Sequence, residues 1–166
     1  MTTSVCCVTG IAVADFNGDG HADLAVLLHN LGVGPTGDQM LVYLGTGGGS
    51  FAAPLSSKVG VYPSALVAGD FNHDGKLDLV VEDQGDLTSS ATPGSGYSIL
   101  LGKGDGTFST PAAIPLGLGS GLHPAGLVAA DLNRDGRLDL AVTFTNGPLL
   151  VLPGRGDGTF PAWQIA

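Results

Sequence analysis

Residues 13–26 read V-A-D-F-N-G-D-G-H-A-D-L-A-V, and two further copies of this motif follow, which indicates a repeat protein. The second copy is A-G-D-F-N-H-D-G-K-L-D-L-V-V at residues 68–81, and the third is A-A-D-L-N-R-D-G-R-L-D-L-A-V at residues 129–142. A glycine-rich phrase comes after each copy: L-G-T-G-G-G-S-F from Leu44, L-G-K-G-D-G-T-F from Leu101 and L-P-G-R-G-D-G-T-F from Leu152. The chain is therefore predicted to consist of three units of one design.

Each unit is predicted to form four short strands, because its apolar runs are short and are bounded by Gly, Asn, Asp and Pro. The first strand ends at the D-F-N or D-L-N motif, and the second starts at the last Asp of the copy. The third ends at the G-x-G turn, and the fourth follows the Phe of the glycine-rich phrase. Proline is tolerated at a sheet edge and blocks further pairing. The fourth strand is therefore expected to be the outer one, with Pro54, Pro111, Pro115 and Pro161.

The expected fold class is all-β, with three four-stranded antiparallel blades of a β-propeller. Tandem four-stranded units of about 50 to 60 residues are typical of propeller blades, and a solenoid of stacked sheets is the weaker alternative. The 166 residues are expected to form one repeat domain. Its blades are expected at about residues 5–57, 58–117 and 118–166.

Composition excludes several classes of protein. The chain has 15 acidic against 6 basic residues and a net charge of −9, which argues against a nucleic-acid or anionic-membrane partner. No apolar run approaches the roughly 18 residues of a membrane span, so no membrane insertion is expected. Cys6 and Cys7 are adjacent and cannot staple distant parts of the chain. The start lacks the features of a secretory signal, so the chain is expected to be intracellular or to have had a signal removed or omitted.

The pattern D-x-N-x-D-G-x-x-D occurs once in each unit and offers the oxygen donors that Ca²⁺ prefers. Numbered from the first Asp, positions 1, 3, 5 and 9 supply side-chain oxygens. The glycine at position 6 permits a turn that lets the carbonyl of position 7 face the ion. The predicted calcium ligands, about one ion per loop and three per chain, are Asp15, Asn17, Asp19, the His21 carbonyl and Asp23; Asp70, Asn72, Asp74, the Lys76 carbonyl and Asp78; Asp131, Asn133, Asp135, the Arg137 carbonyl and Asp139.

Two other interpretations of these loops were weighed. They are not EF-hands, because position 12 holds Val26, Val81 and Val142 where an EF-hand needs a bidentate Glu. They could be ordinary hairpin turns, which Asp, Asn and Gly favour without a metal. Three copies with all oxygen positions intact favour calcium, since three carboxylates in one small loop repel one another. Three Ca²⁺ would change the net charge from −9 to −3.

The sequence resembles the FG-GAP (VCBS-type) repeats of integrin α-subunit propellers and of many bacterial surface proteins. The resemblance lies in the aspartate loop and the later G-x-G-D-G-x-F turn, and it covers nearly the whole chain. It implies calcium at the loops above, an extracellular or cell-surface location, and roles in adhesion or lectin-like binding. This chain departs in two ways: Gly48 stands where the other units have Asp105 and Asp157, and three blades are fewer than the usual six or seven.

Several other motifs are discounted. The tripeptide Arg155-Gly156-Asp157 spells a cell-adhesion signal but aligns with the same repeat turn in the other units, so turn chemistry explains it. The four histidines, His21, His29, His73 and His123, show no zinc-ligand spacing. Outside the repeats, the acidic residues Asp38, Glu82, Asp83 and Asp86 lie in two inserts, residues 31–39 and 82–96. They are expected to be solvated loop residues, or alternatively to contact a ligand.

The preferred function is non-enzymatic: a calcium-binding propeller module that recognises a protein or a carbohydrate. The alternatives are the propeller domain of a polysaccharide lyase or hydrolase, for which no acid/base pair is found, and a purely architectural half-propeller. Propellers close with about 4 to 8 blades. Two chains are therefore expected to form a six-bladed homodimer, unless this chain is part of a longer one.

Overall fold

The computed structural model describes residues 6–30, 38–84, 96–115, 124–145, 147–161 and 164–165. Within these residues the chain forms twelve strands and no helix, in three four-stranded antiparallel sheets. None of the described segments is a helix that could cross a membrane. The all-β class predicted from the sequence is therefore confirmed, and we call the three sheets blades 1, 2 and 3 in chain order.

The strands begin and end where the repeated motifs do. Blade 1 contains β1 (Cys6–Ala14), β2 (Asp23–Asn30), β3 (Gln39–Tyr43) and β4 (Leu55–Lys58). Blade 2 contains β5 (Pro63–Gly69), β6 (Asp78–Asp83), β7 (Gly96–Leu100) and β8 (Ala112–Pro115). Blade 3 contains β9 (Pro124–Ala130), β10 (Asp139–Phe144), β11 (Leu149–Leu152) and β12 (Gln164–Ile165). In each blade the aspartate loop joins the first two strands.

The order within each sheet follows the chain, so the fourth strand lies at an edge as predicted. The prolines sit slightly differently from the prediction. Pro115 ends β8, whereas Pro54, Pro111 and Pro161 precede the fourth strands rather than lying inside them. Since proline has no N–H to give to a ladder, these positions avoid the loss of a strand hydrogen bond.

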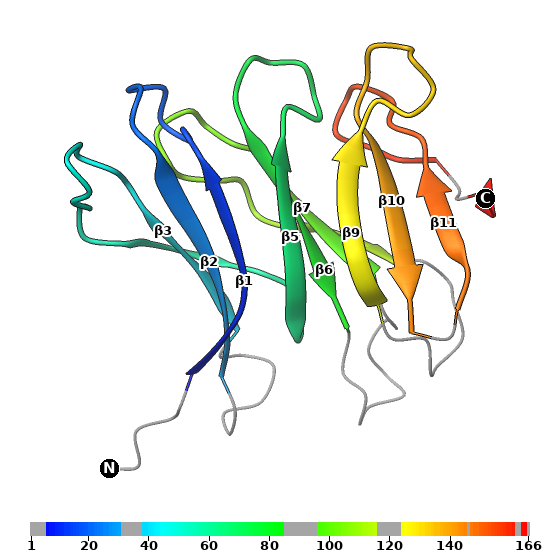
Figure 1. Ribbon diagram of the computed structural model, residues 1–166, viewed down its shortest axis with the longest axis horizontal. Helices are drawn as coiled ribbons and strands as arrows, with labels where there is room; N and C mark the ends of the chain where they lie inside the picture. Colours follow the sequence, from blue (N-terminus) through cyan, green and yellow to red (C-terminus); the bar gives the residue numbers. More distant parts are fainter. Residues whose placement is uncertain are drawn as a thin grey trace.

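The blades stack side by side, with β5 between β1 and β9 (Figure 1). One apolar core lies between blades 1 and 2 and a second between blades 2 and 3. Strand β6 of the middle blade contains an unbroken apolar run, Leu79 to Val81, because both of its faces are buried. Leu79 and Val81 belong to the first core and Val80 to the second, so every residue of β6 is buried.

The two end faces of the stack are apolar and have no neighbouring blade. Ile11, four residues before the first loop Asp, is 58% exposed, whereas its repeat equivalents Leu66 and Leu127 are each 9% exposed. Val128 on the outer face of blade 3 is likewise 58% exposed. The exposure therefore comes from position in the stack, because equivalent residues in the interior are covered by a neighbouring blade.

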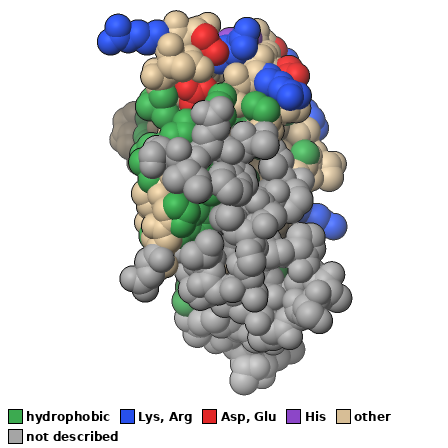
Figure 2. Space-filling view, turned by 90° about the vertical axis from the view of Figure 1, so that its right-hand side faces the viewer, with side chains coloured by type: hydrophobic (Ala, Val, Ile, Leu, Met, Phe, Trp, Pro, Cys, Tyr) green, Lys and Arg blue, Asp and Glu red, His purple; other side chains and the backbone are tan. Residues whose placement is uncertain are grey.

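Charged side chains are placed differently from these apolar faces. Figure 2 views the blade 3 end, and in the described part of that face the acidic and basic side chains gather toward the end of the sheets that carries the aspartate loops. All three loops lie at this same end of the stack (Figure 1).

Candidate metal centres and the opposite end of the blades

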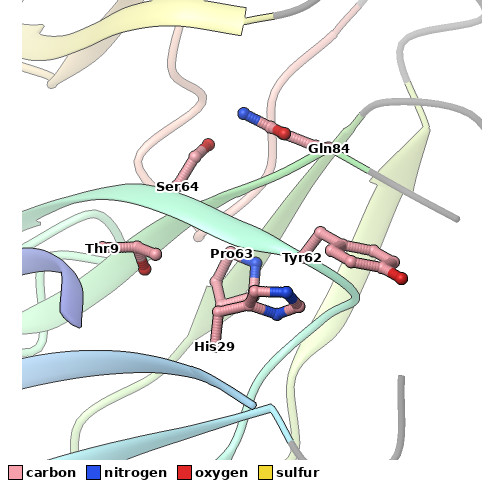
Figure 3. Close-up of a pocket in the computed structure, with 6 residues that line it drawn as sticks. All are labelled: Thr9, His29, Tyr62, Pro63, Ser64 and Gln84. Atoms are coloured by element: carbon pink, nitrogen blue, oxygen red, sulfur yellow. The ribbon is translucent and has the colours of Figure 1, made fainter. Parts of the chain in front are cut away.

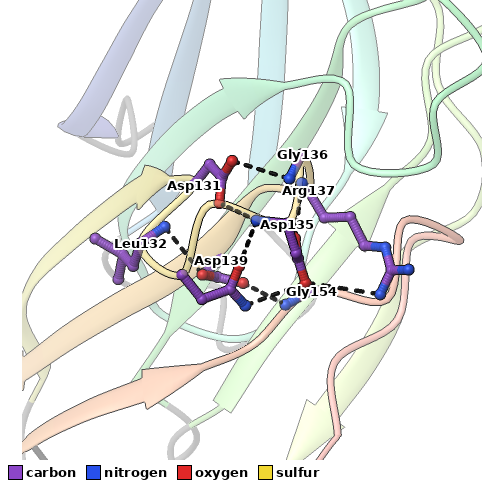
Figure 4. Close-up of polar contacts among 8 residues, drawn as sticks. Asp131, Leu132, Asp135, Gly136, Arg137, Asp139 and Gly154 are labelled. Atoms are coloured by element: carbon purple, nitrogen blue, oxygen red, sulfur yellow. Dashed lines mark hydrogen bonds and ion pairs between the residues drawn. The ribbon is translucent and has the colours of Figure 1, made fainter.

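The first aspartate of each loop binds backbone N–H groups of its own loop. The Asp131 Oδ1 atom accepts from the Asp135 N–H at 3.1 Å, and Oδ2 accepts from the Gly136 N–H at 3.0 Å (Figure 4). Asp70 makes the same two bonds, at 3.1 and 3.0 Å, to the corresponding groups of blade 2. Asp15 repeats the pattern at 3.1 and 2.8 Å. Position 1 therefore organises the whole turn around its carboxylate.

Positions 3 and 5 continue this arrangement. In blade 3 the Asn133 Oδ1 atom accepts from the Asp135 N–H at 2.8 Å, the same N–H that Asp131 binds. The Asp135 Oδ1 atom then accepts from the Arg137 N–H at 2.9 Å. Gly136 has a φ of +85°, which confirms the predicted need for glycine at position 6. The side-chain oxygens of positions 1 and 3 thus converge on one nitrogen in every blade.

Position 9 has a further role that the spacing did not reveal. The buried Asp78 carboxylate accepts from the Phe71 N–H at 3.0 Å within its loop and from the Gly102 N–H at 2.8 Å at the end of the third strand. The equivalent aspartates of blades 1 and 3, Asp23 and Asp139, make the same pair of bonds at 2.7 to 3.0 Å. Each of these aspartates thus links the aspartate loop to the glycine-rich phrase, and we call this pair of hydrogen bonds the staple.

The first glycine of each glycine-rich phrase is required by this staple. A Cβ atom at Gly102 would lie 2.1 Å from the Leu77 carbonyl oxygen, and one at Gly154 would lie 2.0 Å from the Leu138 carbonyl oxygen. Gly45 is packed in the same way against the Ala22 carbonyl. The sequence predicted tight turns from these glycines. The structure adds that the first of them permits a close backbone approach.

The chemistry of the loops suits a hard cation, since the side chains at positions 1, 3, 5 and 9 offer oxygen donors only. Burial raises the pKa of Asp78, although the N–H groups of Gly102 and Phe71 oppose the rise; the nearby Asp74 and Asp70 carboxylates add to it. The three carboxylates of this loop therefore repel one another, as expected. In the described residues, however, no three His, Cys, Asp or Glu side chains gather into a group that could hold a metal. Calcium ligation stays a prediction.

The side chains at position 7 point to solvent. The Lys76 Nζ atom lies 3.8 Å from Asp74 Oδ2, and the Arg137 guanidinium lies 3.7 Å from Asp135 Oδ2. His21 is exposed, as is His73 at position 4 of its loop. His123 lies outside the described residues.

The Arg-Gly-Asp tripeptide is part of a turn, as predicted. The Asp157 Oδ1 atom accepts from the Thr159 N–H at 2.9 Å and from the Thr159 hydroxyl at 2.5 Å. Asp105 and Thr107 make the same two bonds, at 2.9 and 2.6 Å, in blade 2. The carboxylate is thus used within its own turn in both units.

The acidic residues of the inserts differ from the expectation of solvated loops. Asp38, Glu82 and Asp83 are all buried, near the end of the blades opposite the aspartate loops, so the solvated interpretation is wrong for these three. Asp86 lies outside the described residues. Burial follows from the position of Glu82 and Asp83 at the end of β6, which has a blade on each side.

The three acids differ in how far their carboxylate oxygens are hydrogen-bonded. Asp38 binds the His29 ring through Oδ1 and the Tyr62 N–H through Oδ2, at 2.8 and 2.7 Å. The Asp83 Oδ2 atom accepts from the Ser98 hydroxyl at 2.5 Å, but its Oδ1 atom has no hydrogen-bond partner within the described part of the chain. The Glu82 Oε1 atom is also buried, with no hydrogen-bond partner among the described residues. Such atoms favour the protonated carboxyl, because the charged form is poorly solvated.

The pKa values of the last two acids follow from this burial. Burial raises the pKa of Glu82 to about 7, and the neighbouring Asp83 carboxylate adds to the rise. Burial likewise raises the pKa of Asp83 to about 7, although the bond from Ser98 opposes this. Both groups therefore keep protons in the folded chain at pH values where the unfolded chain has lost them.

We expect these two acids to make the chain less stable as the pH rises from about 4 to 7. Their stabilising contribution is fully present below the unfolded pKa values and is lost as the pH passes through the folded values near 7. Glu82→Gln should remove the part of this pH dependence that is due to Glu82. The variant should gain stability relative to the unmodified chain across this range. Urea unfolding from pH 4 to 8 at fixed calcium measures the difference.

Asp105→Asn is the matched control for this prediction, because Asp105 is an exposed acid whose pKa is lowered by its bond from the Thr107 side chain. Its effect should change with pH only at acidic values and should be flat between pH 5 and 8. If the difference in the free energy of unfolding between Glu82→Gln and the unmodified chain is also independent of pH between 5 and 8, Glu82 does not titrate in this range.

A cavity of about 290 Å³ opens between blades 1 and 2 (Figure 3). Its lining residues come from both blades: Thr9, His29, Tyr62, Pro63, Ser64 and Gln84. None of them was a predicted site residue. The sequence pointed to this region only through the insert that contains Asp38. The Asp38 carboxylate hydrogen-bonds to the His29 ring and to the Tyr62 N–H.

Comparison with known protein families gives a consistent result. The model of the FG-GAP-like repeat matches residues 15–81 and 86–142, and that of the FG-GAP repeat matches residues 62–101. No curated protein matches the chain. The first two matches span most of the chain and begin at the first Asp of the first loop. The chain therefore belongs to the FG-GAP-like repeat family.

Proposed function

We propose that this chain is a calcium-stabilised propeller module that binds a carbohydrate or protein ligand and carries out no catalysis. The observation that carries the proposal is the threefold aspartate loop, in which the oxygens at positions 1 and 3 converge in the same way in every blade. A feature needed only for one hairpin would not have to keep the same four oxygen positions in three blades.

Calcium would be held by positions 1, 3, 5 and 9 of each loop and by the position 7 carbonyl. Each carboxylate oxygen has two acceptor sites, so an oxygen that binds an N–H can also bind the ion. Burial is the main cause of the raised pKa of Asp78; the ion would neutralise the repulsion from Asp74 and Asp70 that adds to it. It would therefore stabilise the loop end of the blades rather than supply chemistry.

Calcium is expected to raise the thermal stability of the chain. Each site held at 100 times its dissociation constant adds about 2.7 kcal/mol to the free energy of unfolding. Asp74→Ala should lose one of three sites, since position 5 belongs to a single loop. Calorimetric melting with calcium and with a chelator tests this. A chain that melts at the same temperature in both would contradict the proposal.

We also propose that the chain assembles into a ring, because equivalent residues of the repeats occupy equivalent positions on the blade faces. The uncovered face of blade 1 carries Ile11, which matches Leu66 at the interface between blades 1 and 2. The uncovered face of blade 3 carries Val128, which matches Val67 at the interface between blades 2 and 3. One end face should therefore pack on the other as the internal blades do. Two copies would cover both faces of each and form six blades.

The recognition function is tested by screening the calcium-loaded chain against an array of glycans. Binding that depends on calcium supports the proposal. If calcium binds but no glycan or protein ligand is found, the result favours a purely architectural role. Turnover of a polysaccharide would instead identify the chain as an enzyme domain.

A further inference from the structure

We propose that the cavity between blades 1 and 2 binds one neutral sugar ring of a glycan. This inference rests on the proposed recognition function and names the surface and the class of ligand. The cavity is about 290 Å³, close to the lower limit of typical small-molecule sites, which is room for a single ring rather than a long oligomer.

Two blades must be in place before the cavity exists. Thr9 lies on β1 and His29 on β2 of blade 1. In blade 2, Tyr62 immediately precedes β5, Ser64 lies near its start, and Gln84 follows β6. Figure 3 shows the His29 and Tyr62 side chains on one side of this space and Thr9, Ser64 and Gln84 around it. The site is therefore a product of blade packing.

Tyr62 has a backbone conformation that calls for an explanation. Its φ is +53°, in the left-handed region that aromatic residues rarely adopt. Two hydrogen bonds hold it there: its N–H donates to Asp38 at 2.7 Å, and its carbonyl accepts from the Gln84 N–H at 3.1 Å. Strain of this kind concentrates at binding sites, where the surrounding structure maintains it.

The same carboxylate places the second ring of the cavity. Asp38 is 6% exposed, and its Oδ1 atom lies 2.8 Å from His29 Nδ1. The His29 and Tyr62 ring centroids are 4.6 Å apart. Asp38 thus positions both rings without lining the cavity itself. The result is a preorganised aromatic wall, on which the apolar face of a sugar ring can pack.

The other lining groups favour a neutral, hydroxyl-rich ligand. Besides Pro63, they are the hydroxyls of Thr9 and Ser64 and the amide of Gln84, and no Lys or Arg among the described residues lines the cavity to balance an anion. The Thr9 Oγ1 atom is buried and has no hydrogen-bond partner within the described part of the chain. A buried hydroxyl of this kind can be satisfied by a ligand hydroxyl.

The test is a titration of the calcium-loaded chain with glucose, galactose, mannose and N-acetylglucosamine, read by ligand-observed NMR. At least one sugar is expected to bind. Thr9→Val should weaken that sugar at least fivefold, and Thr46→Val, an exposed threonine in the blade 1 turn, should leave it unchanged. Tyr62→Gly should abolish binding while the chain stays folded, because glycine accepts this φ and keeps the N–H that Asp38 binds.

The outcomes separate this inference from the function on which it rests. If no sugar of the panel binds, or if binding is unchanged in both Thr9→Val and Tyr62→Gly, the cavity is not the sugar site. If the glycan array remains positive in those same variants, recognition stands and takes place on another surface. If the array is negative as well, the carbohydrate function falls together with the cavity.

Discussion

Asp78→Ala should lower the free energy of unfolding by about 2 to 6 kcal/mol, even in the presence of a chelator. The substitution leaves the N–H groups of Phe71 and Gly102, which Asp78 now binds, without an acceptor in the interior. Each buried N–H without a partner costs about 1 to 3 kcal/mol. The chelator removes any contribution of bound calcium, so the loss reports the staple alone.

Asp105→Ala is the control for this prediction. Asp105 is also a repeat aspartate, but it is exposed and accepts its hydrogen bonds from Thr107 within its own turn. Its replacement should cost less than about 1 kcal/mol, as is usual at surface positions. Urea unfolding of both variants is the measurement. Equal losses for the two would mean that the staple of blade 2 is not a main support of the fold.

Ile11→Asp should convert a dimer of about 33 kDa into a folded monomer of 16.5 kDa. Ile11 is already 58% exposed in the single chain, so an aspartate there stays largely in solvent and the chain should still fold. In the proposed ring, the same position would be covered, as Leu66 and Leu127 are, and a buried unpaired charge opposes association. Size-exclusion chromatography with light scattering reads the mass directly.

Ser56→Asp is the matched control, because Ser56 is an exposed residue of the edge strand β4. It should leave the dimer intact. An unmodified chain that is already monomeric at micromolar concentration, with unfolding independent of concentration, would show that the three-blade stack stands alone and that the ring proposal is wrong.

The sequence predicted the strands well, because the signals that set them are local. The second strand of every blade starts at the loop's last Asp, as expected. The third strand ends just before the glycine-rich phrase in blades 1 and 2 and at its first residue, Leu152, in blade 3. The same local reasoning identified Gly136 as a turn residue with positive φ. Features that depend on a few neighbouring residues can be inferred from spacing alone.

What the sequence did not predict depends on contacts between distant residues. The partner of Asp23 at the end of β3, Gly45, lies 22 positions further along the chain. The cavity brings Thr9 together with Tyr62, from different blades. Glu82 was expected to be solvated because it lies in the insert 82–96, outside the repeated motifs. It is buried because blade 3 lies against that face of β6. Such placements follow from blade packing, which periodicity does not specify.

Native mass spectrometry of the unmodified chain in calcium tests the central claim most directly, because it counts chains and ions in one particle. The proposal predicts a dimer of about 33 kDa that carries six calcium ions, one for each aspartate loop, and loses them in a chelator. A folded particle of 16.5 kDa that carries no calcium at millimolar concentrations of the ion would contradict it.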